Sequence, residues 1–141
     1  SGLNVDKKLY VEMIVNNNRR LQPVIGKTQL KVGDKVVVRL TVRLDRTMDF
    51  VQLKDQRAAC LEPVEVLSGY RNVGDVGCYV AVKDASTDFF FDTLNKGTYV
   101  LEYSYRVDRA GSYEAGIATI QSAYAPEYAA HSASARYEVS Q

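Results

Sequence analysis

Between Tyr99 and Val107 the large side chains fall on every second residue. They are Tyr99, Leu101, Tyr103, Tyr105 and Val107. Successive side chains of a β-strand point to opposite faces of the sheet, so this spacing predicts a strand with one large apolar face. Turn-forming residues precede the segment at 95–97 and follow it at 108–111. We therefore predict that residues 99–107 form the central strand of an antiparallel sheet whose apolar face packs on another part of the chain.

A second segment, residues 35–44, alternates even more regularly and predicts another strand with its apolar side chains facing inward. Further strands are predicted at 8–15, 50–55, 78–83, 87–92, 112–121 and 135–139. The short connection at 45–47 predicts a hairpin between the strands at 35–44 and 50–55. Loops are predicted at 19–28, where Pro23 and Gly26 act as breakers, and at 68–69 and 74–77.

No segment repeats apolar residues at helical spacing over three turns, and residues 58–63 fit either a helical turn or an irregular strand. Pro63 argues against a central strand there. We therefore predict an all-β fold, an antiparallel β-sandwich of about seven to eight strands of the immunoglobulin or fibronectin kind. A β-barrel is the alternative.

The chain has 141 residues, which suits a single domain spanning 1–141. Ser1-Gly2 is typical of the scar left by a cleaved purification tag, so we expect an excised piece of a longer protein. A net charge of +1 gives no basic surface for nucleic acid, and no apolar run reaches the roughly 18–20 residues of a membrane span.

The residue types that carry catalysis or bind metals are sparse. His131 is the only histidine, and no nucleophile motif surrounds Ser132 or any other serine, so we do not expect a triad of Ser132, His131 and Asp108. Cys60 and Cys78 fit either two buried thiols or, if the parent protein is exported, one disulfide bridge. They offer no paired spacing for a metal, and we expect neither a metal nor another cofactor.

Three aspartates, Asp84, Asp88 and Asp92, follow one another at intervals of four. Paired carboxylates can serve a glycosidase or a calcium ion, but the calcium loop with its central glycine is absent. We expect solvated carboxylates in turns and at strand edges. The residues thus predict a β-sandwich that is not an enzyme.

Three segments, read together, carry a resemblance to a known family. They are residues 50–63, residues 67–70 and the run 88–131, which includes Phe89-Phe90-Phe91-Asp92, Arg109-Ala110-Gly111 and Tyr124-Ala125-Pro126-Glu127. In this order they resemble the C-terminal macroglobulin-like domain of bacterial α2-macroglobulin family proteins. The resemblance covers nearly all of the chain beyond about Leu30.

The resemblance implies a role within a much larger chain. Such proteins lie in the bacterial periplasm, often lipid-anchored to the inner membrane, and look like protease traps. A target protease cuts a bait region, the molecule changes shape, and in many members a Cys–Gln thioester captures the protease. Cys60 and Cys78 lack a Gly-Cys-x-x-Gln context, so the thioester is not in this chain. The implied partners are the other domains of the parent and, through it, target proteases, with membrane contact only through the parent's anchor.

In thioester-bearing members a tyrosine of this domain covers the thioester and keeps water out. Tyr124 matches that tyrosine, with Pro126 and Glu127 as its turn. In a parent without a thioester, Tyr124 is expected to be an interdomain packing residue. Either role predicts an apolar or aromatic surface patch near Tyr124.

The alternative function is a stand-alone carbohydrate-binding or adhesive sandwich. It predicts a flat row of exposed rings from tyrosines such as Tyr70, Tyr79 and Tyr113.

Overall fold

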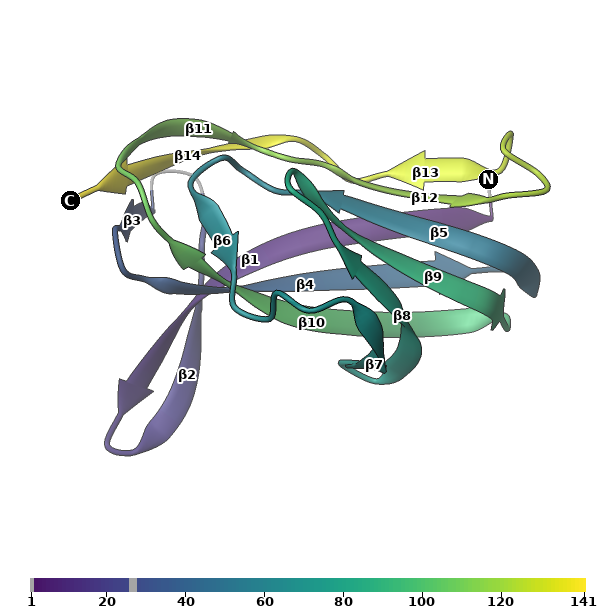
Figure 1. Cartoon of the computed structure of the whole chain (residues 1–141), viewed down its shortest axis with the longest axis horizontal. Coiled ribbons are helices and arrows are strands. Elements are labelled where there is room, and N and C mark those ends of the chain that lie inside the picture. The colour runs from purple at the N-terminus through teal and green to yellow at the C-terminus, as the bar shows by residue number, and fades with distance from the viewer. Residues whose placement is uncertain (1, 26–27) are drawn as a thin grey trace.

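The computed structural model describes residues 2–25 and 28–141, and Figure 1 shows their strands arranged mainly in two layers. The described residues form fourteen strands and contain no helix long and apolar enough to cross a membrane. The predicted fold class, an all-β sandwich, is confirmed. Ser1 of the expected tag scar and the predicted breaker Gly26 lie outside the described residues.

The first layer is a five-stranded antiparallel sheet with the order β2-β1-β4-β10-β6. Its strands are β1 (Leu3–Val15), β2 (Asn18–Pro23), β4 (Lys35–Leu44), β6 (Leu61–Pro63) and β10 (Gly97–Val107). Strand β10, which contains the alternating segment 99–107, is an interior strand as predicted, because β4 pairs with its residues 97–106 on one side and β6 pairs with its residues 105–107 on the other. Pro63 lies on the edge strand β6, where its missing N–H costs no ladder bond.

The second layer is a six-stranded antiparallel sheet with the order β13-β12-β5-β9-β8-β7. Its strands are β5 (Met48–Gln56), β7 (Gly69–Val73), β8 (Val76–Val82), β9 (Ser86–Leu94), β12 (Ala118–Ser122) and β13 (Ala129–His131). A small third sheet has the order β11-β14-β3, and β14 runs parallel to β3 in it. It consists of β3 (Gln29–Lys31), β11 (Gly111–Ala115) and β14 (Ala135–Ser140).

One continuous apolar core lies between the two main sheets. The first sheet contributes Leu40 and Leu101, and the second contributes Leu53, Phe89 and Ile120, all with no exposed surface. Each large buried side chain of this kind stabilises the fold by roughly 1.5–3 kcal/mol before the entropy cost of ordering it. The alternating apolar side chains of residues 35–44 face this core, as predicted.

The predicted hairpin between residues 35–44 and 50–55 is wrong. The first segment is β4 of the five-stranded sheet and the second is β5 of the six-stranded sheet, so residues 45–47 cross from one layer to the other. Both strands have one buried face, which an alternating pattern reveals, but the pattern does not say which neighbour supplies the hydrogen bonds.

The predicted loop at 19–28 is also wrong in its first part, because residues 18–23 form β2. This strand pairs with the end of β1, and the two project from the body of the molecule as a ribbon (Figure 1). Asn16 and Asn17 form the turn at φ 52° and 65°. Most side chains of β2 are exposed, so the strand lacks the apolar alternation by which strands are recognised.

The single strand predicted at 112–121 is two strands in different sheets, β11 and β12. The strand is interrupted between them at Gly116, where a Cβ atom would lie 2.1 Å from the carbonyl oxygen of Gln56. Only glycine allows the backbone to approach β5 this closely. Short strands such as β3, β6, β7 and β13 account for the number of strands above the predicted seven to eight.

Candidate functional site

Tyr124 lies on the loop between β12 and β13, at the end of the molecule where β5 begins (Figure 1). Its side chain is 77% exposed, which is unusual for so large a ring. The ring meets the ring of Phe50 edge to face, with 5.1 Å between the centroids and 84° between the planes. Such pairs contribute about 0.5–1.5 kcal/mol beyond the area that they bury. The fold therefore fixes an aromatic ring outside the core.

Phe50 lies in β5 and is itself 48% exposed. Its φ of 53° lies in the left-handed region, where a bulky side chain is an outlier. On one side of it Met48 is buried, and on the other side Val51 is buried, while Asp49 and Phe50 between them are both exposed. The left-handed residue thus shifts the alternation of β5 by one position.

Hydrogen bonds fix the strand ends that carry these two rings. The backbone N–H of Ala123 donates to the carbonyl oxygen of Phe50 at 2.9 Å, and the hydroxyl of Ser122 donates to the carbonyl oxygen of Asp49 at 3.1 Å. The Asp49 carboxylate accepts a hydrogen bond from the Thr93 hydroxyl at 2.9 Å. The backbone of Phe50 is therefore held directly by a hydrogen bond, and Tyr124 directly follows Ala123, whose backbone is held by the same bond.

A third aromatic residue of this loop, Tyr128, is 37% exposed. The guanidinium of Arg46 lies 4.9 Å from its ring centroid, and one of its N–H groups donates to the Tyr128 hydroxyl at 3.3 Å. Arg46 also pairs with Asp45 at 2.9 Å, and its hydrogen bond lowers the pKa of the Asp45 carboxyl. Pro126 and Glu127 are exposed in the turn that the Tyr128 N–H closes on the Ala125 carbonyl at 2.8 Å.

We call the three rings at this end, Phe50, Tyr124 and Tyr128, the end cluster. The predicted aromatic patch near Tyr124 is present in the structure as this cluster. Phe50 and Arg46 were not among the predicted site residues, since nothing in the local sequence reveals that segments more than seventy residues apart meet. The end cluster offers apolar ring surface, two phenol hydroxyls and one paired guanidinium, groups that suit contact with another surface and exclusion of water from it.

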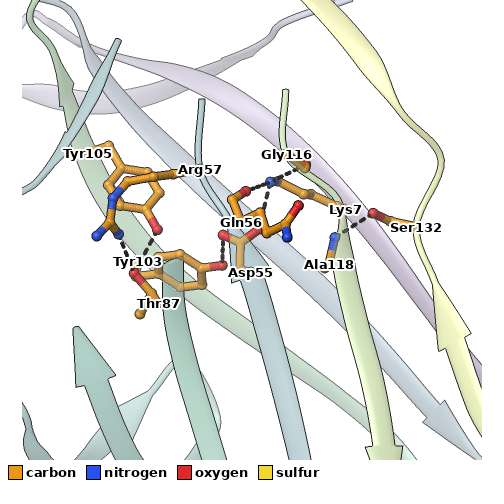
Figure 2. A network of polar contacts seen from close by, with 10 residues as sticks. All are labelled: Lys7, Asp55, Gln56, Arg57, Thr87, Tyr103, Tyr105, Gly116, Ala118 and Ser132. Carbon is orange, nitrogen blue, oxygen red and sulfur yellow. Dashed lines mark hydrogen bonds and ion pairs between the residues drawn. The ribbon is translucent and has the colours of Figure 1, made fainter. Parts of the chain in front are cut away.

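The interior contains a second polar group of residues, which joins the two sheets (Figure 2). Lys7 of β1 reaches across the core to the Asp55 carboxylate of β5 at 2.6 Å, and its ammonium also donates to the carbonyls of Gln56 at 3.0 Å and Gly116 at 2.8 Å. The hydroxyl of Tyr103 donates to the other oxygen of Asp55. Burial raises the pKa of Asp55, and the Lys7 ammonium opposes this effect.

The polar network extends beyond Tyr103 to Thr87, Tyr105 and Arg57. The hydroxyls of Thr87 and Tyr105 share a hydrogen bond of 2.9 Å, and Arg57 donates to Thr87 at 2.9 Å. The side chains of Lys7 and Asp55 are 7% and 0% exposed, so the ion pair lies almost entirely out of solvent. This network is best explained as a clamp between the sheets.

The residues considered for a triad do not assemble into one. Ser132 is buried, and its hydroxyl accepts a hydrogen bond from the Ala118 N–H at 2.9 Å. The ring of His131 contacts the Ser132 carbonyl oxygen at 3.0 Å, not its hydroxyl. Asp108 lies 3.7 Å from Arg109, and its backbone N–H donates to the Cys60 carbonyl.

The prediction that all three spaced aspartates are solvated is wrong for Asp88. Asp84 and Asp92 are exposed, but Asp88 has no exposed surface. Its carboxylate forms an ion pair with Lys83 at 2.9 Å without the geometry of a hydrogen bond. No group of three or more metal-ligating side chains comes together within residues 2–25 and 28–141.

Both cysteines are buried free thiols, so of the two interpretations the structure supports the unbridged one. Burial raises the pKa of Cys78 to about 11 and also raises the pKa of Cys60. Both thiols are therefore held in their protonated, unreactive form at neutral pH.

The tyrosines of the alternative function do not form a flat row. Tyr70 is 81% exposed, but its ring meets that of Tyr79 at an interplanar angle of 74°. Beside them lies a hollow of about 680 Å³ that is also lined by Phe90 and Asp92. Tyr113 belongs to a different sheet, where its hydroxyl donates to the Ala110 carbonyl at 2.8 Å.

Comparison with known proteins gives one family and one fold. The sequence profile of the bacterial alpha-2-macroglobulin MG10 domain matches residues 2–127. A search of curated proteins gives no match.

Solved structures that share this fold include Salmonella alpha-2-macroglobulin reacted with methylamine, with 21% identity and a TM-score of 0.76. Another is native Escherichia coli alpha-2-macroglobulin from domain MG7 to the C-terminus, with 15% identity and a TM-score of 0.77. The whole of this chain is covered in both comparisons, but it spans only 9% of the Salmonella chain and 24% of the Escherichia coli chain.

Proposed function

This chain belongs to the bacterial alpha-2-macroglobulin family as an MG10 domain, and we propose that it is a non-catalytic part of a larger protease-trap protein. In this proposal the end cluster contacts another domain of the parent chain. The parent lies in the periplasm, is anchored to the inner membrane through a lipid, and acts on target proteases that this domain does not itself bind.

The observation that carries the proposal is the exposure of Tyr124. Its ring is 77% exposed yet fixed edge to face against Phe50. Exposed large rings at a fixed position are the usual anchors of protein interfaces, because they bury much area with little loss of side-chain entropy. A neighbouring domain that covers this ring would gain that area.

Where the parent carries a thioester, we propose that Tyr124 shields it. An acyl bond is protected from hydrolysis when an apolar ring excludes water from it, and the phenol hydroxyl can donate a hydrogen bond nearby. Within this chain the only thiols are those of Cys60 and Cys78, which are buried. The thioester would therefore belong to another domain, and the role of Tyr124 would be exercised across a domain interface.

The test uses the full-length parent in three forms, wild type, Tyr124→Phe and Tyr124→Ala. Each is treated with methylamine, which opens thioesters, and its intact mass is followed with time. We expect the adduct to form fastest in Tyr124→Ala, because the ring no longer excludes the amine, and at an intermediate or unchanged rate in Tyr124→Phe, which keeps the ring. An adduct that forms equally fast in all three would contradict shielding, and no adduct in any form would leave interdomain packing as the role of Tyr124.

A further inference from the structure

We propose that Phe50 is the positioning residue for Tyr124: it fixes the tyrosine ring in the pose in which a neighbouring domain of the parent chain receives it. The inference rests on the proposed function, because it concerns how the contact surface around Tyr124 is built. It assigns a specific role within that surface to Phe50 of strand β5.

The first step of the argument is the backbone of Phe50. A φ of 53° is unfavourable for a non-glycine residue, a cost that glycine avoids. The bend at this position is needed, since it lets Met48 and Val51 both face the core while Asp49 reaches the surface and bonds Thr93. A glycine would make the same bend, so the bend does not explain a phenylalanine.

The second step is what the phenylalanine ring contacts. The side chain is 48% exposed, so burial in the core does not offset the backbone strain. Its aromatic contact is with Tyr124, at 5.1 Å and 84°. Residues with strained backbone conformations cluster at functional sites. We therefore assign the ring of Phe50 to the support of Tyr124.

The third step is rigidity. The carbonyl of Phe50 accepts the hydrogen bond from Ala123, the residue before Tyr124, so the backbones that carry the two rings are joined directly. Without the Phe50 ring, Tyr124 would rotate freely on its exposed loop and would lose that freedom on docking. A ring fixed in advance avoids this loss, which for a large side chain corresponds to roughly a two- to thirteenfold difference in affinity.

The occupant is a neighbouring domain of the same parent chain. The whole of this chain matches the Salmonella structure but spans only 9% of that chain. A parent of that kind therefore has ample surface in its other domains to receive the end cluster. The receiving surface should be an apolar pocket with an acceptor for the phenol hydroxyl, because the exposed part of Tyr124 is a ring with one hydroxyl at its tip.

The strain is tested in this chain with Phe50→Gly and Phe50→Ala, compared by urea unfolding. Both remove the ring, but only alanine keeps a Cβ atom at positive φ. We expect the folding equilibrium constant of Phe50→Gly to exceed that of Phe50→Ala by about three- to tenfold. A Phe50→Gly chain that is less stable than Phe50→Ala would overturn the assignment of strain.

The positioning role is tested in the full-length parent by hydroxyl-radical footprinting of Tyr124, read by mass spectrometry. In the 141-residue chain Tyr124 should be labelled strongly. In the wild-type parent its labelling should fall several-fold, in the Phe50→Gly parent it should return most of the way, and in the Phe50→Tyr parent, which keeps a ring, it should stay low. Tyr70, exposed on the edge strand β7 three strands away from β5 in the same sheet, should be labelled equally in wild type and Phe50→Gly and serves as the reference.

The outcomes separate this inference from the proposed function. If Tyr124 is labelled as strongly in the wild-type parent as in the 141-residue chain, Tyr124 is not an interdomain contact and both proposals fail. If Tyr124 is protected in the wild-type parent and equally protected in Phe50→Gly, the interdomain contact stands and the role of Phe50 is refuted.

Discussion

Tyr105 and Tyr124, nineteen positions apart in the sequence, have opposite roles as single side chains. Tyr105 is 1% exposed and shares its hydroxyl with Thr87 inside the sandwich. Tyr124 is 77% exposed and touches Phe50 at the surface. The same side chain is therefore part of the core in one place and a contact surface in the other. Substitution should separate the two parts.

We expect Tyr124→Ala to lower the free energy of unfolding of this chain by no more than about 1 kcal/mol, the value of one exposed aromatic pair. Tyr105→Ala, the matched control, should cost about 3–5 kcal/mol because it leaves a cavity and removes a buried hydrogen bond. Urea unfolding followed by far-ultraviolet circular dichroism measures both. A loss of several kcal/mol for Tyr124→Ala would make Tyr124 a core residue and would sink its proposed contact role.

The ion pair of Lys7 and Asp55 yields a second prediction at this scale. Lys7→Met removes the ammonium and leaves the Asp55 carboxyl buried with only the Tyr103 hydroxyl, which should cost about 3–5 kcal/mol near neutral pH. Arg39→Met breaks the partly exposed pair with Glu102 on the outer side of the first sheet and should cost less than about 1 kcal/mol. Equal losses for the two variants would contradict the clamp.

The same variant has a pH signature. Burial raises the pKa of Asp55 above its unfolded value, and loss of Lys7 should raise it further. A carboxyl whose folded pKa is raised stabilises the fold below its unfolded pKa and loses that contribution as pH rises. The deficit of Lys7→Met relative to wild type should therefore be smaller at pH 4 than at pH 7, which repeated urea unfolding at both values would show.

At the scale of strands, the sequence predicted those with one face in the core and missed those without. The apolar alternation of β4 and β10 follows from burial of one face, so it is visible in the sequence. Strand β2 buries almost nothing, and β3 and β13 are three residues long, so no period marks them. The turn of Asn16 and Asn17 was the available signal for β2, since two adjacent asparagines at positive φ suit a two-residue hairpin.

Sheet membership and the candidate site were less accessible. Gly116 separates β11 from β12 because of its distance to the Gln56 carbonyl, which is a contact between segments sixty residues apart. Tyr124 was identified from a family resemblance, but its partner Phe50 was not, because a positive φ at a phenylalanine in a strand has no sequence signal. Both failures concern contacts between distant segments, which local periodicity does not encode.

The β1–β2 ribbon gives a prediction at this scale. Asn17 has a φ of 65°, and glycine adopts such a value without strain, so Asn17→Gly should raise the free energy of unfolding by about 0.5 kcal/mol. Asn18 is the matched control. It lies in β2 without a positive φ, so Asn18→Gly should lower that free energy by a similar amount. Two changes of the same sign, measured by thermal unfolding, would argue against the asparagine turn.

Across the whole molecule, five buried or partly buried hydroxyls and thiols have raised pKa values. Burial raises the pKa values of Cys60, Tyr103, Tyr105 and Tyr137, and that of Cys78 to about 11. In the unfolded chain these groups ionise at the ordinary values of about 8.5 for cysteine and about 10 for tyrosine. Between those values and the raised ones, the folded chain binds more protons than the unfolded chain.

The slope of the unfolding free energy with pH is proportional to the number of protons bound by the unfolded state minus the number bound by the folded state. That difference is negative here, so the free energy of unfolding should fall as the pH rises above about 9. The contribution of these groups is complete below the unfolded pKa of cysteine and declines as pH approaches the raised values. Cys78 alone, whose pKa is raised to about 11, should account for roughly 3 kcal/mol. Urea unfolding between pH 7 and pH 11 should show this decline in the free energy of unfolding. The decline should be shallower in Cys78→Ala, because that variant lacks the contribution of the Cys78 thiol. An unfolding midpoint that stays constant to pH 11 would mean that the core admits the ionised groups, and the two sheets would then be less tightly closed than their buried side chains indicate.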